Sequence, residues 1–182
     1  MHHARRTTLA SLAVLTLGLT ALLTGCASPT TREGMTPGDL VAAKKHPQTV
    51  SVAVTGGQET NPLWKSQVSN TSFAEALSDA ITRSKVFSAV VQGKGGDYQL
   101  DVVLVSMTQP SFGASFTVSM EAGWSLRRTD SGAVVWQASV KSKHTARAGD
   151  AFVGTERLRL ATEGAAKNNI KQGLEQISSL NL

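Results

Sequence analysis

The chain has 182 residues, and its 18 Lys and Arg residues exceed its 13 Asp and Glu residues to give a formal net charge of +5. This weak surplus, without clustered basic and aromatic residues, argues against a nucleic-acid-binding protein. With only one cysteine the chain has no internal disulfide, so side-chain packing has to hold the fold together.

The first 25 residues have the pattern of a secretory signal peptide. Arg5 and Arg6 precede an apolar segment over residues 9–23. Its length of about 15 residues is less than the roughly 20 that a membrane-spanning helix needs. Thr24 and Gly25 are small, and the single cysteine, Cys26, follows directly. We therefore predict a signal peptide over residues 1–25, cleaved between Gly25 and Cys26. Loss of both arginines lowers the net charge to +3.

Leu23-Thr24-Gly25-Cys26 resembles the lipobox of bacterial lipoproteins. In that family the cysteine sulfur receives diacylglycerol, the preceding peptide is removed, and the new amino end usually receives a fatty acid such as palmitate. A thiolate is the nucleophile that forms the thioether. The resemblance implies lipidation of Cys26. An ordinary secreted protein and a membrane-anchoring helix are the alternatives.

Export by the general secretory route is favoured over the twin-arginine route. Arg5 and Arg6 resemble the start of a twin-arginine signal, but the aromatic residue and the lysine that complete that pattern are missing. After Cys26, the residues Ala27 and Ser28 lack the aspartate that marks inner-membrane retention in enterobacterial lipoproteins. That resemblance implies the periplasmic face of the outer membrane.

Residues 26–47 are predicted to be a flexible tether, because they are rich in Ser, Thr, Pro, Gly and charge. A strand is predicted over residues 49–55 from alternating valines. The long loop 58–71 then carries Asn61, Leu63 and Trp64. Trp64 either packs under the loop or contacts a partner.

A helix is predicted from Ser72 to about Ser84, with Ser72 and Glu75 as a capping box. A short strand follows over residues 86–91. The glycine-lysine turn 92–96 lacks the spacing of a phosphate-binding loop. Three longer strands come next, the last two joined by a hairpin at residues 129–132. In the first of them, Val103, Val105 and Met107 make an otherwise polar face apolar.

The irregular segment 147–154 contains Phe152, and Thr155 is expected to cap a last helix that runs to about Ser179. Residues 48–182 are therefore predicted to form one domain of the α+β class. We expect an antiparallel or mixed sheet of four or five strands with two helices packed on one face, in the order β-α-β-β-β-β-α.

This layout behind a lipobox resembles small periplasmic lipoproteins of Gram-negative envelope assembly and transport. These include the lipopolysaccharide-assembly lipoprotein and the auxiliary lipoproteins of ABC-type export systems. The resemblance implies a non-enzymatic adaptor that binds another envelope protein. We expect no metal and no cofactor. We expect the partner at a sheet edge and at two loops, with Asn61, Leu63, Trp64 and Phe152 as candidate contacts.

Two other functions remain open at this point. A carrier of a lipid or another amphiphile is suggested by the apolar residues on the polar sheet face. An envelope enzyme is less favoured, because no nucleophile motif or metal-ligand spacing occurs. The residues that such an enzyme would have to use are His46, His144, Asp97 and Asp101.

Overall fold

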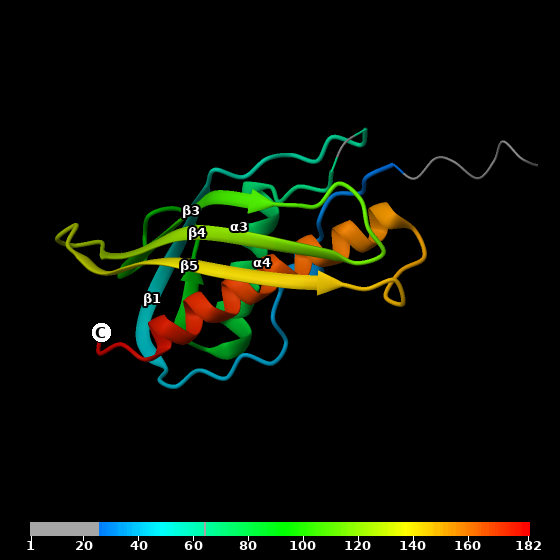
Figure 1. Cartoon of the computed structure of the whole chain (residues 1–182). Helices are drawn as coiled ribbons and strands as arrows, with labels where there is room; N and C mark the ends of the chain where they lie inside the picture. The colour runs from blue at the N-terminus through cyan, green and yellow to red at the C-terminus, as the bar shows by residue number, and fades with distance from the viewer. Residues whose placement is uncertain (1–25, 64) are drawn as a thin grey trace, which may run out of the picture.

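Five strands form one mixed sheet in the order β2-β1-β3-β4-β5 (Figure 1). The structure is a computed structural model that describes residues 26–63 and 65–182. β1 runs parallel to both of its neighbours, β2 and β3, whereas β3, β4 and β5 are antiparallel. The strands are β1 (His46–Thr55), β2 (Phe87–Val91), β3 (Tyr98–Thr108), β4 (Phe116–Arg128) and β5 (Val134–Ala146).

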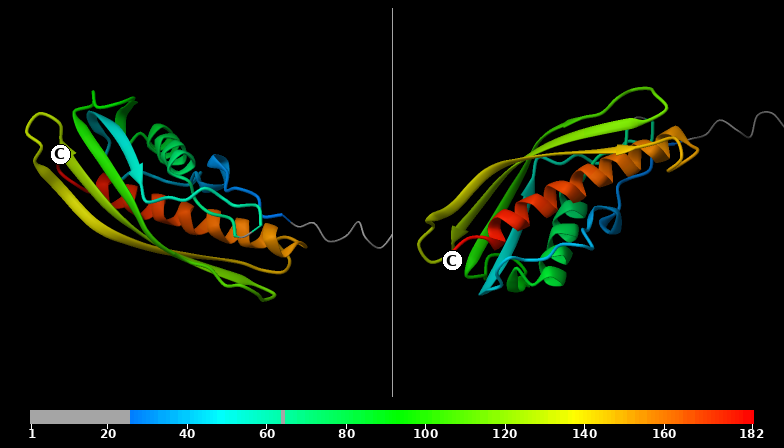
Figure 2. Two further views of the ribbon diagram at one scale, coloured as in Figure 1. Left: turned by 90° about the horizontal axis from the view of Figure 1, so that it is seen from above. Right: turned by 60° about the horizontal axis from the view of Figure 1, so that its bottom comes forward.

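Two long helices cover one face of this sheet, and the other face stays open (Figure 2). α3 (Asn70–Ser84) packs on β1 and β2, and α4 (Gly154–Ser178) packs on β4 and β5. A short helix, α2 (Arg32–Met35), lies against both α3 and α4. The predicted α+β class and element order are confirmed, with α2 as an addition.

Strict alternation in β4 supplies the centre of the core. Every second side chain from Phe116 to Leu126 is buried, and Trp124 is 1% exposed. The Trp124 indole lies so close to α4 that a Cβ added at Gly173 would come within 2.7 Å of its ring. Gly173 therefore lets the helix approach the sheet, which compensates for its low helix propensity.

Both predicted helix caps were wrong. α3 begins earlier than expected, because Ser69 is the N-cap and its hydroxyl accepts a hydrogen bond from the Ser72 amide at 3.1 Å. α4 has Val153 at its N-cap position, and no side chain caps it. Thr155 lies inside its first turn. Ser69 and Ser72 lie three residues apart and both carry a hydroxyl that could cap α3, so the sequence alone does not decide between them.

Met107 lies on the opposite face from the one predicted. The pairing of β3 with β4 shifts between Leu104 and Ser106, so that one extra residue, Val105, bulges outward. This bulge reverses the alternation, and Met107 pairs with the buried Met120. Only Val103 and Val105 remain as exposed apolar residues on the open face of β3.

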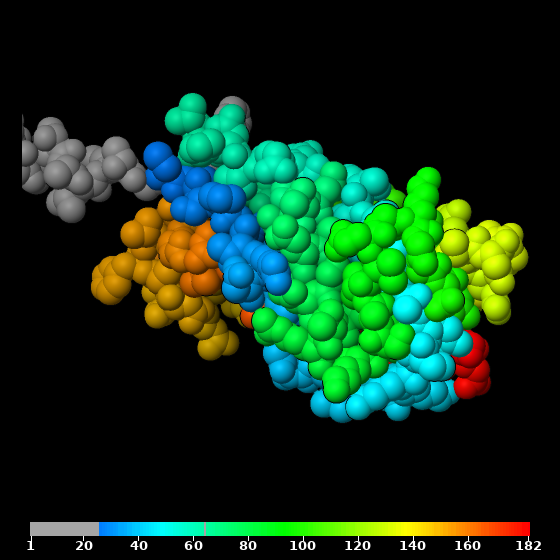
Figure 3. Space-filling model, turned by 180° about the vertical axis from the view of Figure 1, so that it is seen from behind, coloured from blue at the N-terminus to red at the C-terminus, as the bar shows by residue number. Residues whose placement is uncertain are grey.

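The structure also differs from the predicted tether. Residues 27–45, which we call the strap, run along α3 and α4, and Met35 and Leu40 are buried in the core. His46, assigned to the tether, begins β1, and its ring nitrogen lies 3.1 Å from the Ile177 carbonyl oxygen. Figure 3 shows the strap, in blue, lying across the back of the molecule.

Candidate functional site

Cys26 is exposed at the point where the described chain joins the folded body. The next residue, Ala27, is 5% exposed, and its amide donates a hydrogen bond of 2.9 Å to the Pro62 carbonyl oxygen. The thiol is therefore one residue away from a fixed backbone contact. Gly25 and the signal peptide lie outside the described residues. Among the described residues, no helix has the length and apolar character needed to span a bilayer.

A buried carboxylate on α4 holds the start of the strap. Glu163 is 4% exposed, and its Oε1 accepts hydrogen bonds from the Thr31 amide at 2.7 Å and the Thr31 hydroxyl at 2.9 Å. Arg159, one turn earlier on α4, pairs with Glu163 and with Glu156. These contacts raise the pKa of Arg159, chiefly through its hydrogen bond to Glu156. The strap is thus tied to a charged cluster on α4.

Further ion pairs fasten the strap along its length. The Arg32 guanidinium forms two hydrogen bonds, of 2.5 and 2.6 Å, with the Asp79 carboxylate on α3. Lys171 on α4 donates to Asp39 at 2.5 Å, and this hydrogen bond holds the pKa of the Asp39 carboxyl below its usual value. Cys26 therefore keeps a defined position relative to the domain.

The loop between β1 and α3 presents Leu63, which is 87% exposed. Asn61 shapes this loop, because its side-chain oxygen accepts a hydrogen bond from the Leu63 amide at 3.0 Å. Such a contact is typical of an Asx turn. Trp64, the other predicted contact residue here, lies outside the described residues.

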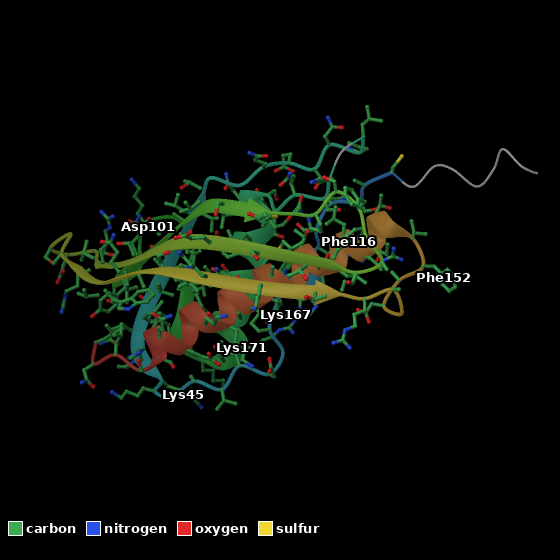
Figure 4. The ribbon with its side chains drawn as sticks, viewed as in Figure 1. Lys45, Asp101, Phe116, Phe152, Lys167 and Lys171 are labelled. Carbon is green, nitrogen blue, oxygen red and sulfur yellow. The ribbon has the colours of Figure 1, made fainter. Side chains whose placement is uncertain are left out.

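The loop between β5 and α4 presents Phe152, whose side chain is fully exposed and points away from the body (Figure 4). Arg157 supports it from α4, donating hydrogen bonds to the Ala151 carbonyl oxygen at 2.7 Å and to the Phe152 carbonyl oxygen at 2.9 Å. The Arg157 guanidinium also lies over the Phe116 ring, 5.6 Å from its centroid. Phe152 therefore projects from a supported loop.

A third exposed apolar residue, Phe112, was missed by the sequence analysis. It is 88% exposed in the loop between β3 and β4. The Lys65 ammonium donates to the Gln109 carbonyl oxygen at 3.1 Å and to the Ser111 hydroxyl at 3.3 Å, which joins this loop to the one that carries Leu63. An aromatic residue between Pro110 and Gly113 was the signal in the sequence.

These three loops and the start of the strap lie at the same end of the molecule. Figures 1 and 2 show them together, opposite the β4–β5 hairpin and the C-terminus. We call this region the Cys26 end; it consists of Cys26, Leu63, Phe112 and Phe152. Among the described residues, the exposed Leu and Phe side chains all belong to it.

The residues considered for catalysis each have a structural contact. Asp97 accepts hydrogen bonds from the Thr49 amide and hydroxyl, both at 2.7 Å, and the amide contact is the main cause of its lowered pKa. Asp101 pairs with Arg127 at 3.1 Å. The His144 ring packs against the backbone of Gly164. The described residues contain no group of three potential metal ligands.

β5 is an edge strand, and its two halves differ in how far α4 side chains occupy its backbone carbonyl oxygens. Along its second half, the side-chain amides of Asn168 and Asn169 donate to the carbonyl oxygens of Lys143 and Val140 at 2.9 and 2.8 Å. Along its first half, Val134 and Val135 are 52% and 38% exposed. Of the two halves of β5, the first therefore offers the freer edge for another strand; β2 is the other edge strand of the sheet.

No model of a known protein family matches the chain, and no curated protein matches it in sequence. Solved structures match it in fold. Protein XCC0632 from Xanthomonas campestris, of family DUF330, has a TM-score of 0.55 at 11% identity and covers 83% of this chain and 91% of its own.

Two further structures have similar scores. The PelC dodecamer from Paraburkholderia phytofirmans has a TM-score of 0.51 at 14% identity, covering 78% of this chain and 94% of its own. A minor lipoprotein from Acinetobacter baumannii has a TM-score of 0.50 at 12% identity, covering 74% of this chain and 93% of its own. The chain thus shares its fold with lipoproteins of Gram-negative bacteria.

Proposed function

We propose that this chain is a lipoprotein of the Gram-negative outer membrane, anchored at the periplasmic face through acylated Cys26. There it acts as a non-enzymatic adaptor that binds another envelope protein. The observation that carries the proposal is the exposed thiol of Cys26, directly behind a signal-like segment and directly before the folded domain.

Support for a place in the envelope comes from the fold and from the lipobox. The structures that share the fold include a minor lipoprotein of Acinetobacter baumannii. The absence of aspartate at Ala27 and Ser28 favours the outer membrane. Within the envelope, we propose a role in assembly or transport, like that of the lipopolysaccharide-assembly and ABC-export lipoproteins that the layout resembles.

The free half of the β5 edge supports the adaptor role. Unpaired backbone amides and carbonyls on an edge strand can hydrogen-bond a strand from another protein. Val134 and Val135 add apolar contact area beside them. Each candidate catalytic residue has a structural contact, although Asp97 and His144 are exposed, and we propose binding rather than chemistry.

The amphiphile carrier receives less support. A ligand between the sheet and the helices would have to share that space with fully buried side chains from both layers. Among them are Trp124, Phe73, Leu77, Ile81, Leu126 and Ile170. Because these side chains already fill the core, the adaptor is preferred.

Replacing the lipidation residue tests the anchor. We expect Cys26→Ser to abolish acylation, so that the chain remains an uncleaved precursor without fatty chains. Intact-mass measurement of the purified protein, together with density fractionation of envelopes, checks this outcome. The unchanged chain should carry acyl groups and sediment with outer membranes. Equal masses and equal fractionation of the two proteins would contradict the proposal.

Site-specific crosslinking tests the adaptor. A photoreactive amino acid at Gln137, exposed on the free half of β5, should capture one defined envelope protein from intact cells. The matched position is Lys94, exposed in the turn between β2 and β3. Capture of many proteins from both positions, or of none from Gln137, would count against an adaptor that binds through β5.

A further inference from the structure

We propose that the Cys26 end is a membrane-docking surface, on which Leu63, Phe112 and Phe152 insert into the same lipid leaflet as the acyl chains. This inference rests on the proposed lipidation of Cys26 and deepens it. The lipid would then fix the orientation of the whole domain, with its strands running away from the bilayer surface, rather than only keeping the protein nearby.

The lipid anchor lies close to the folded domain. Because the Ala27 amide is bonded to Pro62 and the strap is fastened to α3 and α4, no flexible linker separates Cys26 from the body. Consecutive Cα atoms are about 3.8 Å apart, so an acylated Cys26 would hold the Pro62 loop at the level of the lipid headgroups. This end of the domain has to touch the membrane.

The Cys26 end presents large exposed apolar side chains. Leu63, Phe112 and Phe152 are 87%, 88% and 102% exposed. Large apolar side chains exposed to this degree cost free energy in water and gain it at a lipid interface. Val153, 53% exposed, lies next to Phe152 and adds to the apolar area. The three residues come from three separate loops, which gives the surface more than one contact point.

Hydrogen bonds support the loops that carry these side chains. Asn61, Lys65 and Arg157 each bond the backbone of a loop that carries an exposed apolar residue. Gln109 adds a side-chain hydrogen bond of 2.9 Å to the Thr162 hydroxyl on α4. Loops held in this way keep their apolar residues pointing outward before they meet the membrane. Less conformational entropy is therefore lost when these residues insert.

The opposite end of the molecule has a different character. The hairpin between β4 and β5 turns through Thr129, Asp130 and Ser131, which are polar and exposed. Val134 lies near this hairpin, at the far end of β5. It provides a matched exposed apolar position that should stay in water.

Lipid quenching of fluorescent probes tests the proposal. The full chain is expressed in a Gram-negative host that acylates lipoproteins, as four single variants: Leu63→Cys, Phe112→Cys, Phe152→Cys and, as control, Val134→Cys. An acylated Cys26 has no free thiol, so a bimane label attaches only to the new cysteine. The proteins are placed in vesicles of phosphatidylethanolamine and phosphatidylglycerol that contain nitroxide lipid.

We expect bimane at 63, 112 and 152 to lose fluorescence to nitroxides about 5–10 Å below the headgroups, and bimane at 134 to lose none. Equal quenching at all four positions, or none at the three loop positions, would overturn the proposal. Crosslinks from these positions to another protein or to a second copy of the chain, in the absence of lipid quenching, would overturn the proposal as well. Intact mass, measured before the vesicles are added, separates the two failures, because missing acyl chains contradict the lipidation itself.

Discussion

Trp124→Ala is expected to lower the free energy of unfolding by about 3–5 kcal/mol, the largest loss for any single core residue. The indole is 1% exposed and packs against Gly173 of α4. Its Nε1 donates a hydrogen bond of 3.0 Å to the buried Asn169 side-chain oxygen. The substitution leaves a cavity and an unpaired acceptor, and unfolding in urea followed by circular dichroism measures the loss.

Two matched variants separate the contributions of volume and hydrogen bonding. Trp124→Phe keeps most of the ring volume but loses the contact with Asn169, so we expect a loss of about 1–3 kcal/mol. Trp136 on β5 is only partly buried, and Trp136→Ala should cost less than Trp124→Ala. If both tryptophan-to-alanine variants were equally stable, the core would not be centred on Trp124.

Much of the sheet was predictable because its signals are local. Period-two alternation from Phe116 to Leu126 is visible in the sequence and matches the buried face of β4, and the glycine turn after Asp130 predicts the hairpin to β5. The spacing of Phe73, Leu77 and Ile81 in the sequence likewise matches the buried face of α3. The central place of β1 was not predictable, since it depends on parallel pairing with strands far along the chain.

The strap was not predictable because its contacts are between residues distant in sequence. Its composition is that of a tether, and only Met35 and Leu40 supply large buried apolar side chains. The bond from Thr31 to Glu163 joins residues 132 positions apart. Glu163 lies in the middle of a helix, and nothing in the sequence around it indicates that it is buried or which residue it binds.

The candidate site was only partly predictable. Leu63 and Phe152 were noticed as apolar residues in irregular segments, and both are exposed at the same end as Cys26. Phe112 was missed because it lies between Pro110 and Gly113, in the break between two predicted strands. The three residues share one end of the sheet because their loops follow β1, β3 and β5, which run in the same direction, and these directions depend on pairing between distant strands.

Glu163→Ala is expected to release the strap while leaving the sheet folded. The variant removes the acceptor of both Thr31 hydrogen bonds, and hydrogen bonds to a charged group contribute about 1.5–3 kcal/mol each. A net loss of about 2–4 kcal/mol would raise hydrogen exchange at the Met35 and Thr36 amides by about 30- to 1,000-fold. Exchange measured by mass spectrometry on strap peptides checks this, with β4 peptides as internal reference.

The matched control is Glu33→Ala, which removes an exposed carboxylate from the short helix α2 of the strap and should change exchange little. In the acylated protein, loss of the Thr31 contacts would leave the Ala27–Pro62 hydrogen bond and the bond from the Ser66 hydroxyl to Ser28 as the links next to Cys26, so the domain would be held less firmly at the membrane. Lipid quenching of a probe at Phe112 should then fall in Glu163→Ala but not in Glu33→Ala. Unchanged exchange and unchanged quenching in Glu163→Ala would mean that the strap does not hold the domain at the membrane.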